Sequence, residues 1–160
     1  MLKRREKMKL GNVINIAVFV AGLDEEYQNN IIVGINEFSR KNNINVSYFA
    51  AFGGMIESRL FDIGEYSIYG LANLDKFDGA ILMTNTINDN TQKEEISQRI
   101  KDSGIPAVVF DCDNISEFYN ISIDNTKAMR EMVRHVIKEH GAKTINYISG
   151  PMSNPEAVER

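Results

Sequence analysis

Short β-branched, apolar runs alternate with longer amphipathic stretches along the chain, and this alternation limits the possible folds more than any other feature. It is typical of βαβ units built around a parallel sheet. Most of the runs are almost continuously apolar, as expected for strands that helices cover on both faces. We therefore predict an α/β fold with a doubly wound, Rossmann-like open sheet of about five parallel strands, joined by right-handed crossovers. The predicted strands are residues 14–20, 46–51, 79–83, 107–110 and 144–148, with a shorter peripheral strand at 119–123.

Amphipathic stretches separate these strands and are the predicted helices. In the first of them, Ile31, Ile35 and Phe38 share one face at helical spacing. The last follows Asp124, a suitable N-cap, and stops before Gly141, a suitable residue for the C-terminal cap. The predicted helices are residues 28–41, 64–73, 92–102 and 126–140.

Composition excludes several classes of protein. With 160 residues, 43% of them hydrophobic and 25% charged, the chain is long enough for one α/β domain with a real core. The net charge of -4 argues against a body that coats nucleic acid, because such binding needs clustered Lys and Arg. The basic residues at 1–12 are interpreted as a solvated leader. No stretch approaches the roughly 20 apolar residues that span a bilayer, so we expect no membrane contact.

Cysteine usage and the N-terminal residues bear on the compartment. The single cysteine, Cys112, excludes an intramolecular disulfide and suits a reducing environment. The basic start and the apolar run that follows resemble a secretory signal, but Asn15 interrupts the run and Asp24 begins an acidic group where a cleavage region should be. We therefore predict a cytoplasmic protein.

Polar and aromatic residues follow the predicted strands at their carboxyl ends. An open α/β sheet places its ligand at this edge, so these residues are the candidates for contact with a ligand. Their hydroxyl, amide, carboxylate and aromatic groups suit hydrogen bonding and stacking with a polyhydroxylated or heterocyclic ligand better than bond breaking. The candidate ligand-binding residues are Asp24, Tyr27, Phe52, Thr84, Asn85 and Asp111.

Enzymatic and cofactor-dependent functions lack their sequence fingerprints. There is no G-x-G-x-x-G after the first strand, no G-x-x-x-x-G-K-[ST] and no G-x-S-x-G. His135 and His140 are five positions apart, roughly 500 degrees of helical rotation, so we expect separate surface histidines and no metal site. Cys112 stands between two acidic residues, which disfavours the thiolate that a nucleophile needs. We predict no catalytic residue and no cofactor.

One alternative is a stand-alone flavodoxin-like or receiver-like signalling domain. The acidic residues 24–26, together with Asp111 and Asp113, suggest a receiver's magnesium and phosphorylation site. A receiver, however, has its acidic pair directly at the end of the first strand and its acceptor aspartate after the third, where this chain has Thr84 and Asn85. Residues 24–26 are equally explained as first-turn carboxylates that favour the helix dipole, and the second pair as a solvated turn.

An ordered series of segments resembles the ligand-binding domain of LacI-family regulators. The segments are FDGAIL at 77–82, IPAVVFD at 105–111, IDN at 123–125, HGAKTI at 140–145 and ISGP at 148–151. The resemblance implies the fold of type I periplasmic binding proteins, in which two similar lobes clamp a sugar, purine or similar effector. It implies an N-terminal lobe at 13–149 and, at 150–160, a crossover loop with the truncated first turn of a second-lobe helix. On this interpretation the chain is a fragment.

The resemblance also carries expectations about partners. In the family, the helix after the Gly-Pro loop carries an arginine that commonly contacts the effector, and the spacing from Gly150 places it at Arg160. The family dimerises through these lobes, so we expect a homodimer that senses a small polar effector such as a sugar. Nothing before Val13 provides a helix-turn-helix, so we expect no direct nucleic-acid contact by this chain. The output would be DNA binding or, as in sensors fused to GGDEF modules, cyclic-di-GMP synthesis.

Overall fold

The computed structural model describes residues 13–53, 59–110, 117–150, 152, 157–158 and 160. The chain divides into two compact units, the first ending at Ile121 and the second beginning at Ser122. The lobe expected at 13–149 therefore crosses the division between the units. The basic leader at 1–12 lies outside the described residues.

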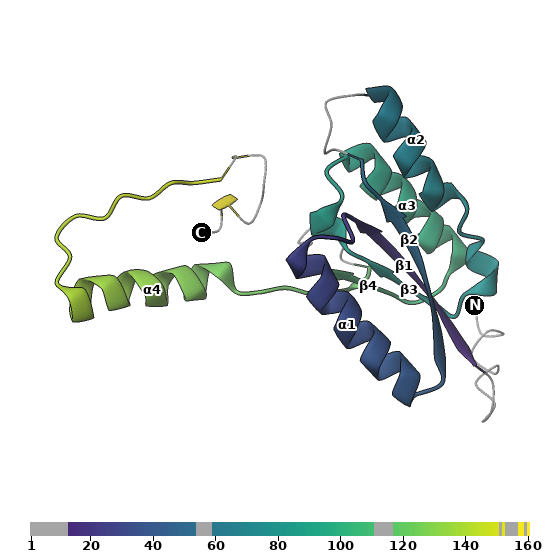
Figure 1. Ribbon diagram of the computed structural model, residues 1–160, viewed down its shortest axis with the longest axis horizontal. Helices are drawn as coiled ribbons and strands as arrows, with labels where there is room; N and C mark the ends of the chain where they lie inside the picture. Colours follow the sequence, from purple (N-terminus) through teal and green to yellow (C-terminus); the bar gives the residue numbers. More distant parts are fainter. Residues whose placement is uncertain (1–12, 54–58, 111–116, 151, 153–156, 159) are drawn as a thin grey trace. The chain divides into compact units, whose positions relative to one another are not determined.

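The first unit is built on a parallel sheet of five strands in the order β2-β1-β3-β4-β5 (Figure 1). The doubly wound α/β fold is thereby confirmed, and four strands lie within two residues of their predicted bounds. The fifth is the short edge strand after β4, which the sequence marks as peripheral. The strands are β1 Ile14–Ala21, β2 Ile44–Ala51, β3 Gly79–Leu82, β4 Ala107–Phe110 and β5 Tyr119–Ile121.

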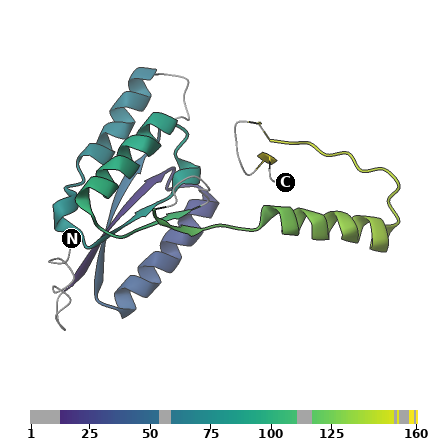
Figure 2. The same cartoon turned by 180° about the vertical axis from the view of Figure 1, so that it is seen from behind.

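Helices cover the two faces of this sheet unequally. Helix α1 lies on one face, and α2 and α3 lie side by side on the other (Figures 1 and 2). Helix α2 starts at Arg59, five residues before its predicted start at Gly64. Glycine disfavours helix interiors, but Gly64 is accommodated in the second turn of this helix. The helices are α1 Glu26–Lys41, α2 Arg59–Gly70 and α3 Asn90–Ser103, with 3-10 turns η2 Leu74–Lys76 and η3 Thr84–Thr86.

The main core lies between the sheet and the α2–α3 layer. Alternate residues of β1 point into it, and Phe19 stacks on Phe49 with ring centroids 5.4 Å apart. Tyr69 of α2 packs edge-on against Phe19 and donates a hydrogen bond from its hydroxyl to the Val20 carbonyl at 3.0 Å. Each such fully buried large side chain stabilises the fold by about 1.5–3 kcal/mol. This packing fixes the carboxyl ends of the central strands against the helices.

Helix α3 is held in place at both ends and along one side. The Asp89 carboxylate accepts a hydrogen bond from the Gln92 backbone N–H at 3.0 Å, and the helix ends at Gly104 with a φ of 67°. Arg99 donates to the backbone carbonyls of Tyr69 and Ala72, each at 2.8 Å. The guanidinium therefore ties α3 to the last turn of α2.

The second unit contains helix α4 (Asn125–His140). Both predicted caps are confirmed: Asp124 accepts a hydrogen bond from the Lys127 backbone N–H at 2.8 Å, and Gly141 has a φ of 64°. No described helix of either unit is both long and apolar enough to cross a bilayer.

The strand predicted at 144–148 is wrong. These residues have no strand partner in the described part of the second unit, and Ile148 is 95% exposed. A β-branched run shows only that a segment fits a sheet, whereas a strand forms when a neighbour pairs with its backbone. The peripheral run at 119–123 supplies the fifth strand of the sheet because it pairs with β4.

Candidate functional site

The loops at the carboxyl edge of the sheet are joined by hydrogen bonds into one rim. After β1, the Gly22 backbone N–H donates to the Ala51 carbonyl at 2.9 Å, which ties the end of β1 to the end of β2. The Ala21 N–H donates to the Thr86 hydroxyl at 3.0 Å, and that hydroxyl donates to the Met83 carbonyl at 2.8 Å. Thr86 is thus a residue of the rim that the candidate list lacks. The sequence signal for Thr86 is its place in the short polar segment that follows the buried strand β3.

Two of the predicted ligand-binding residues are in direct contact on this rim. The Asn85 side-chain amide (Nδ2) donates a hydrogen bond to the Tyr27 hydroxyl at 2.9 Å. Tyr27 belongs to the first turn of α1 and is 40% exposed, whereas Asn85 belongs to the turn η3 after β3. The pairing of β1 with β3 brings these distant segments together. The pair presents an aromatic ring beside an amide.

Thr84 takes a different place from its two neighbours on the rim. It is only 3% exposed, and its hydroxyl donates to the Phe110 carbonyl at the end of β4. The structure therefore gives Thr84 a part in holding the end of β3 next to the end of β4. Its contact with a ligand stays a prediction.

Phe52 follows β2 at the same edge and is partly exposed. Its backbone N–H donates to the Glu65 carboxylate (Oε2) of α2 at 2.9 Å. Glu65 therefore fixes the loop that carries Phe52, a function for which a helical glutamate gives no sequence signal.

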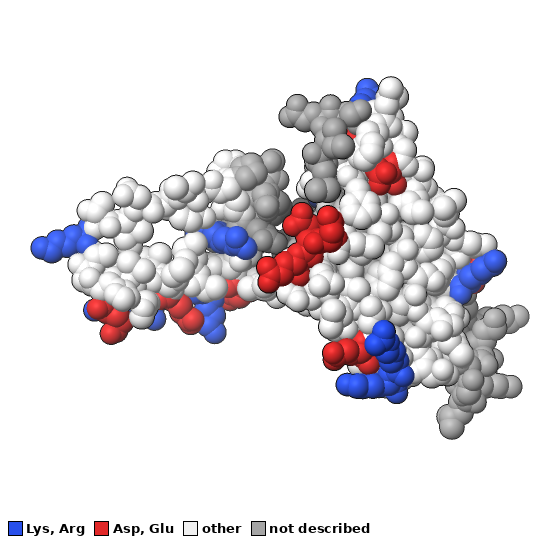
Figure 3. Space-filling model, in the orientation of Figure 1, with Lys and Arg blue, Asp and Glu red and all other residues white. Residues whose placement is uncertain are grey.

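Acidic side chains gather at the start of α1 and basic ones at its end (Figure 3). Asp24 is exposed just before this helix, Glu26 lies in its first turn, and Arg40 and Lys41 lie in its last turn. This arrangement complements the helix dipole, as expected for the first-turn carboxylates. It also gives the rim beside Tyr27 a negative potential, which favours ligands that donate hydrogen bonds over anions.

The remaining two candidates cannot be placed on the rim. Asp111 lies outside the described residues, as do Cys112 and Asp113. Arg160 belongs to the second unit, where its Nε donates to the Asn125 side-chain oxygen at 3.0 Å. Its contact with an effector stays a prediction.

His135 and His140 are exposed on α4, as expected, but the two side chains are not separate. The Nε2 atoms of His135 and His140 are 3.1 Å apart, and the two rings meet edge to face. His140 is the last residue of the helix, so regular helical geometry constrains its side chain less, and the side chain can turn back towards His135. Among the described residues, no three His, Cys, Asp or Glu side chains converge as metal ligands would.

No protein-family model and no curated protein matches the sequence. Solved structures do match. The Lac repressor dimer bound to operator and the anti-inducer ONPF has a TM-score of 0.67 at 15% identity, over 94% of this chain and 49% of that one. The transcription regulator CcpA of Lactococcus lactis has a TM-score of 0.68 at 20% identity, over 92% and 50%.

A galactofuranose binding protein matches as well, with a TM-score of 0.62 at 15% identity, over 91% of this chain and 48% of that one. The fold is that of a LacI-type, periplasmic-binding-protein-like lobe. The chain spans about half the length of each of these structures. In the LacI-type lobe, the Tyr27–Asn85 pair lies at the edge of the sheet where open α/β folds bind their ligands.

Proposed function

We propose that this chain is part of the ligand-sensing domain of a LacI-type regulator, and that it binds a small polar effector and catalyses no reaction. The observation that carries the proposal is the Tyr27–Asn85 pair at the carboxyl edge of the LacI-type sheet. The matching structures named above include the Lac repressor, a transcription regulator and a galactofuranose binding protein, which supports a binding function over an enzymatic one.

The chemistry of the rim favours a sugar-like effector. The partly exposed ring of Tyr27 can stack on the apolar face of a sugar, and the Asn85 amide both donates and accepts hydrogen bonds. Asp24 is an acceptor for ligand hydroxyls, and the negative potential beside it favours a neutral sugar over a sugar phosphate. Phe52 follows β2 at the same edge, and Asp111 stays a predicted contact because it follows β4 in the sequence.

The proposed mechanism is closure of two lobes on the effector. The first lobe is residues 13–149, and residues 150–160 begin the second lobe, from which Arg160 would contact the effector. The effector shifts the equilibrium towards the closed form only by its differential affinity for that form. Closure would bias an output module, DNA-binding or diguanylate cyclase, within a cytoplasmic homodimer.

The test is a thermal-shift screen of the protein, expressed from its complete reading frame, against sugars, sugar phosphates, nucleosides and amino acids. We expect stabilisation by neutral sugars. Replacement of Asn85 by Ala should weaken binding by about tenfold, because a buried ligand hydroxyl loses its partner. The matched control is Asn36→Ala. Asn36 lies further along α1, and its side-chain oxygen accepts a hydrogen bond from the Tyr48 hydroxyl at 2.9 Å, so this change removes the acceptor of a second Tyr–Asn pair.

Two outcomes would count against this proposal. Equal weakening by the Asn85 and Asn36 variants would mean that the rim is not the ligand site. A response limited to magnesium or phosphoryl donors would favour the receiver-like alternative instead.

A further inference from the structure

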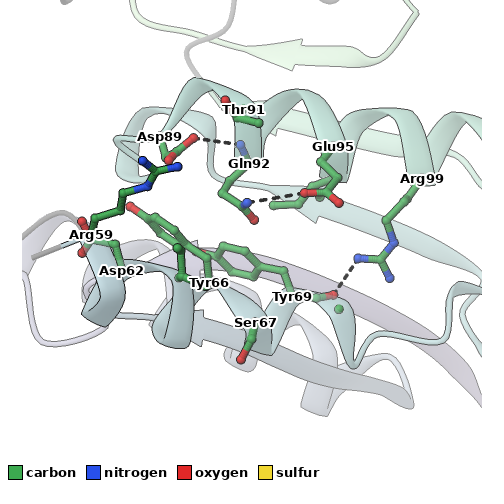
Figure 4. Close-up of a pocket in the computed structure, with 13 residues that line it drawn as sticks. Arg59, Asp62, Tyr66, Ser67, Tyr69, Asp89, Thr91, Gln92, Glu95 and Arg99 are labelled. Atoms are coloured by element: carbon green, nitrogen blue, oxygen red, sulfur yellow. Dashed lines mark hydrogen bonds between the residues drawn. The ribbon is translucent and has the colours of Figure 1, made fainter.

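A cavity of about 620 Å³ lies between α2 and α3, on the face of the sheet opposite α1 (Figure 4). Its floor is aromatic and aliphatic, formed by Tyr66, Tyr69 and Ile96. Carboxylates from both helices line it, together with two arginines and a glutamine. None of these residues belongs to the rim, so the cavity is a second place where a small molecule could bind.

Tyr66 is the unusual residue of this cavity. It is only 5% exposed, its ring stacks on Tyr69 with centroids 5.9 Å apart, and it lies against the backbone at Gly53. Its hydroxyl is fully buried and has no hydrogen-bond partner in the described part of the chain. Figure 4 shows this hydroxyl pointing to the end of the cavity where Arg59 and Asp89 lie. A ligand group that bonds to it would remove the penalty of a buried unsatisfied hydroxyl.

The charges around Tyr66 select the kind of ligand. Burial, followed by the charges of Asp62 and Asp89, raises the pKa of the Tyr66 hydroxyl, so it stays protonated in a negative potential. Glu95 extends this potential along α3, six residues beyond Asp89, which is about 9 Å of helix. Three carboxylates and two arginines line the cavity, so its net charge is negative and favours a cation over an anion or a neutral ligand.

The two arginines of the cavity have different positions. The Arg99 guanidinium is already bonded to two carbonyls at the end of α2. Arg59 is exposed at the first turn of α2. The positive charge of Arg59 therefore competes with a cationic ligand for the carboxylates of the cavity, while its side chain leaves the aromatic floor open.

We propose that this cavity binds a short aliphatic diamine. One ammonium group donates to the Tyr66 hydroxyl and lies beside the Asp89 carboxylate, and the second reaches Glu95 further along α3. The methylene chain lies over the aromatic floor. This site is independent of the effector rim and does not rest on the proposed sensing function.

The test is calorimetric titration of the protein with 1,4-diaminobutane, with 1,4-butanediol as the uncharged probe of similar shape. We expect the diamine to bind and the diol not to bind. Tyr66→Phe should weaken diamine binding at least about tenfold, because it removes a hydrogen bond to a charged group. Asp89→Asn, which keeps an N-cap side chain, should weaken it several-fold, and Arg59→Gln should strengthen it about threefold.

The control is Asp102→Asn, which removes a carboxylate of α3 that lies outside the cavity and accepts from Gln98 at 2.8 Å. The proposal is overturned if the diamine gives no binding heat, if Asp102→Asn weakens binding as much as Asp89→Asn, or if Tyr66→Phe has no effect. Thermal melting checks the Tyr66 variant itself. It should melt at or above the temperature of the parent, and a lower melting temperature would show that the hydroxyl has a partner within the protein.

Discussion

At the scale of single residues, a residue's position in the chain predicts its place in the fold better than it predicts the burial or the hydrogen-bond partners of its side chain. The places of Tyr27 and Asn85 at the carboxyl edge follow from strand ends that the sequence marks clearly. The burial of Thr84 does not, since a threonine after a strand can face solvent or turn inward with the same local pattern. The unsatisfied hydroxyl of Tyr66 also escapes sequence analysis, because it depends on the neighbours that two packed helices supply.

Gly53 offers a test at this scale. A Cβ atom added there would lie 2.6 Å from Cζ and 2.7 Å from Cε1 of the Tyr66 ring. Because that ring is stacked on Tyr69, we expect Gly53→Ala to destabilise the protein by about 1–3 kcal/mol in urea denaturation. Gly64→Ala is the matched control, since nothing lies within 4 Å of its added Cβ and the change should stabilise α2 by about 0.5–1 kcal/mol. Equal losses in both variants would contradict this explanation.

At the scale of helices and strands, capping and periodicity predict the elements whose determinants are local. The bounds of α3 agree with prediction within two residues because Asp89 and Gly104 mark its ends. The run at 144–148 has the right composition for a strand and forms none in the described residues, because pairing is a property of the sheet and not of the segment.

The link between α2 and α3 can be tested at this scale. Arg99→Lys should destabilise the protein by about 1–3 kcal/mol, because an ammonium cannot bond both carbonyls of the α2 end in the planar geometry of a guanidinium. Hydrogen exchange should rise first in the last turn of α2. Lys93→Gln, on the same helix, should leave both measurements nearly unchanged.

At the scale of the whole molecule, the chain divides into two compact units at Ile121, within the lobe that the sequence predicts at 13–149. Helix α4 continues the alternation of strands and helices but belongs to the second unit, so periodicity alone does not predict where one unit ends. The buried core residues all lie in the first unit.

We therefore expect the chain truncated after Ile121 to fold by itself. Its thermal unfolding should stay cooperative, because the truncation removes no member of the core cluster. Truncation after Ser103 is the control, since it removes the buried β4 residues Ala107 and Val109 and should abolish cooperative unfolding. Loss of cooperativity in the longer form would show that the second unit is needed for folding.

The central position of β1 has a consequence for synthesis on the ribosome. Ile14 pairs with Ile44 on one side, and Ile16 pairs with Gly79 on the other, so the first strand made has no partner until much later segments emerge. Parallel pairings across such sequence separations are slow to form. The nascent chain therefore carries an apolar strand with both edges open until β2 is made and with one edge open until β3 is made, and this is the interval in which chaperone binding would matter most.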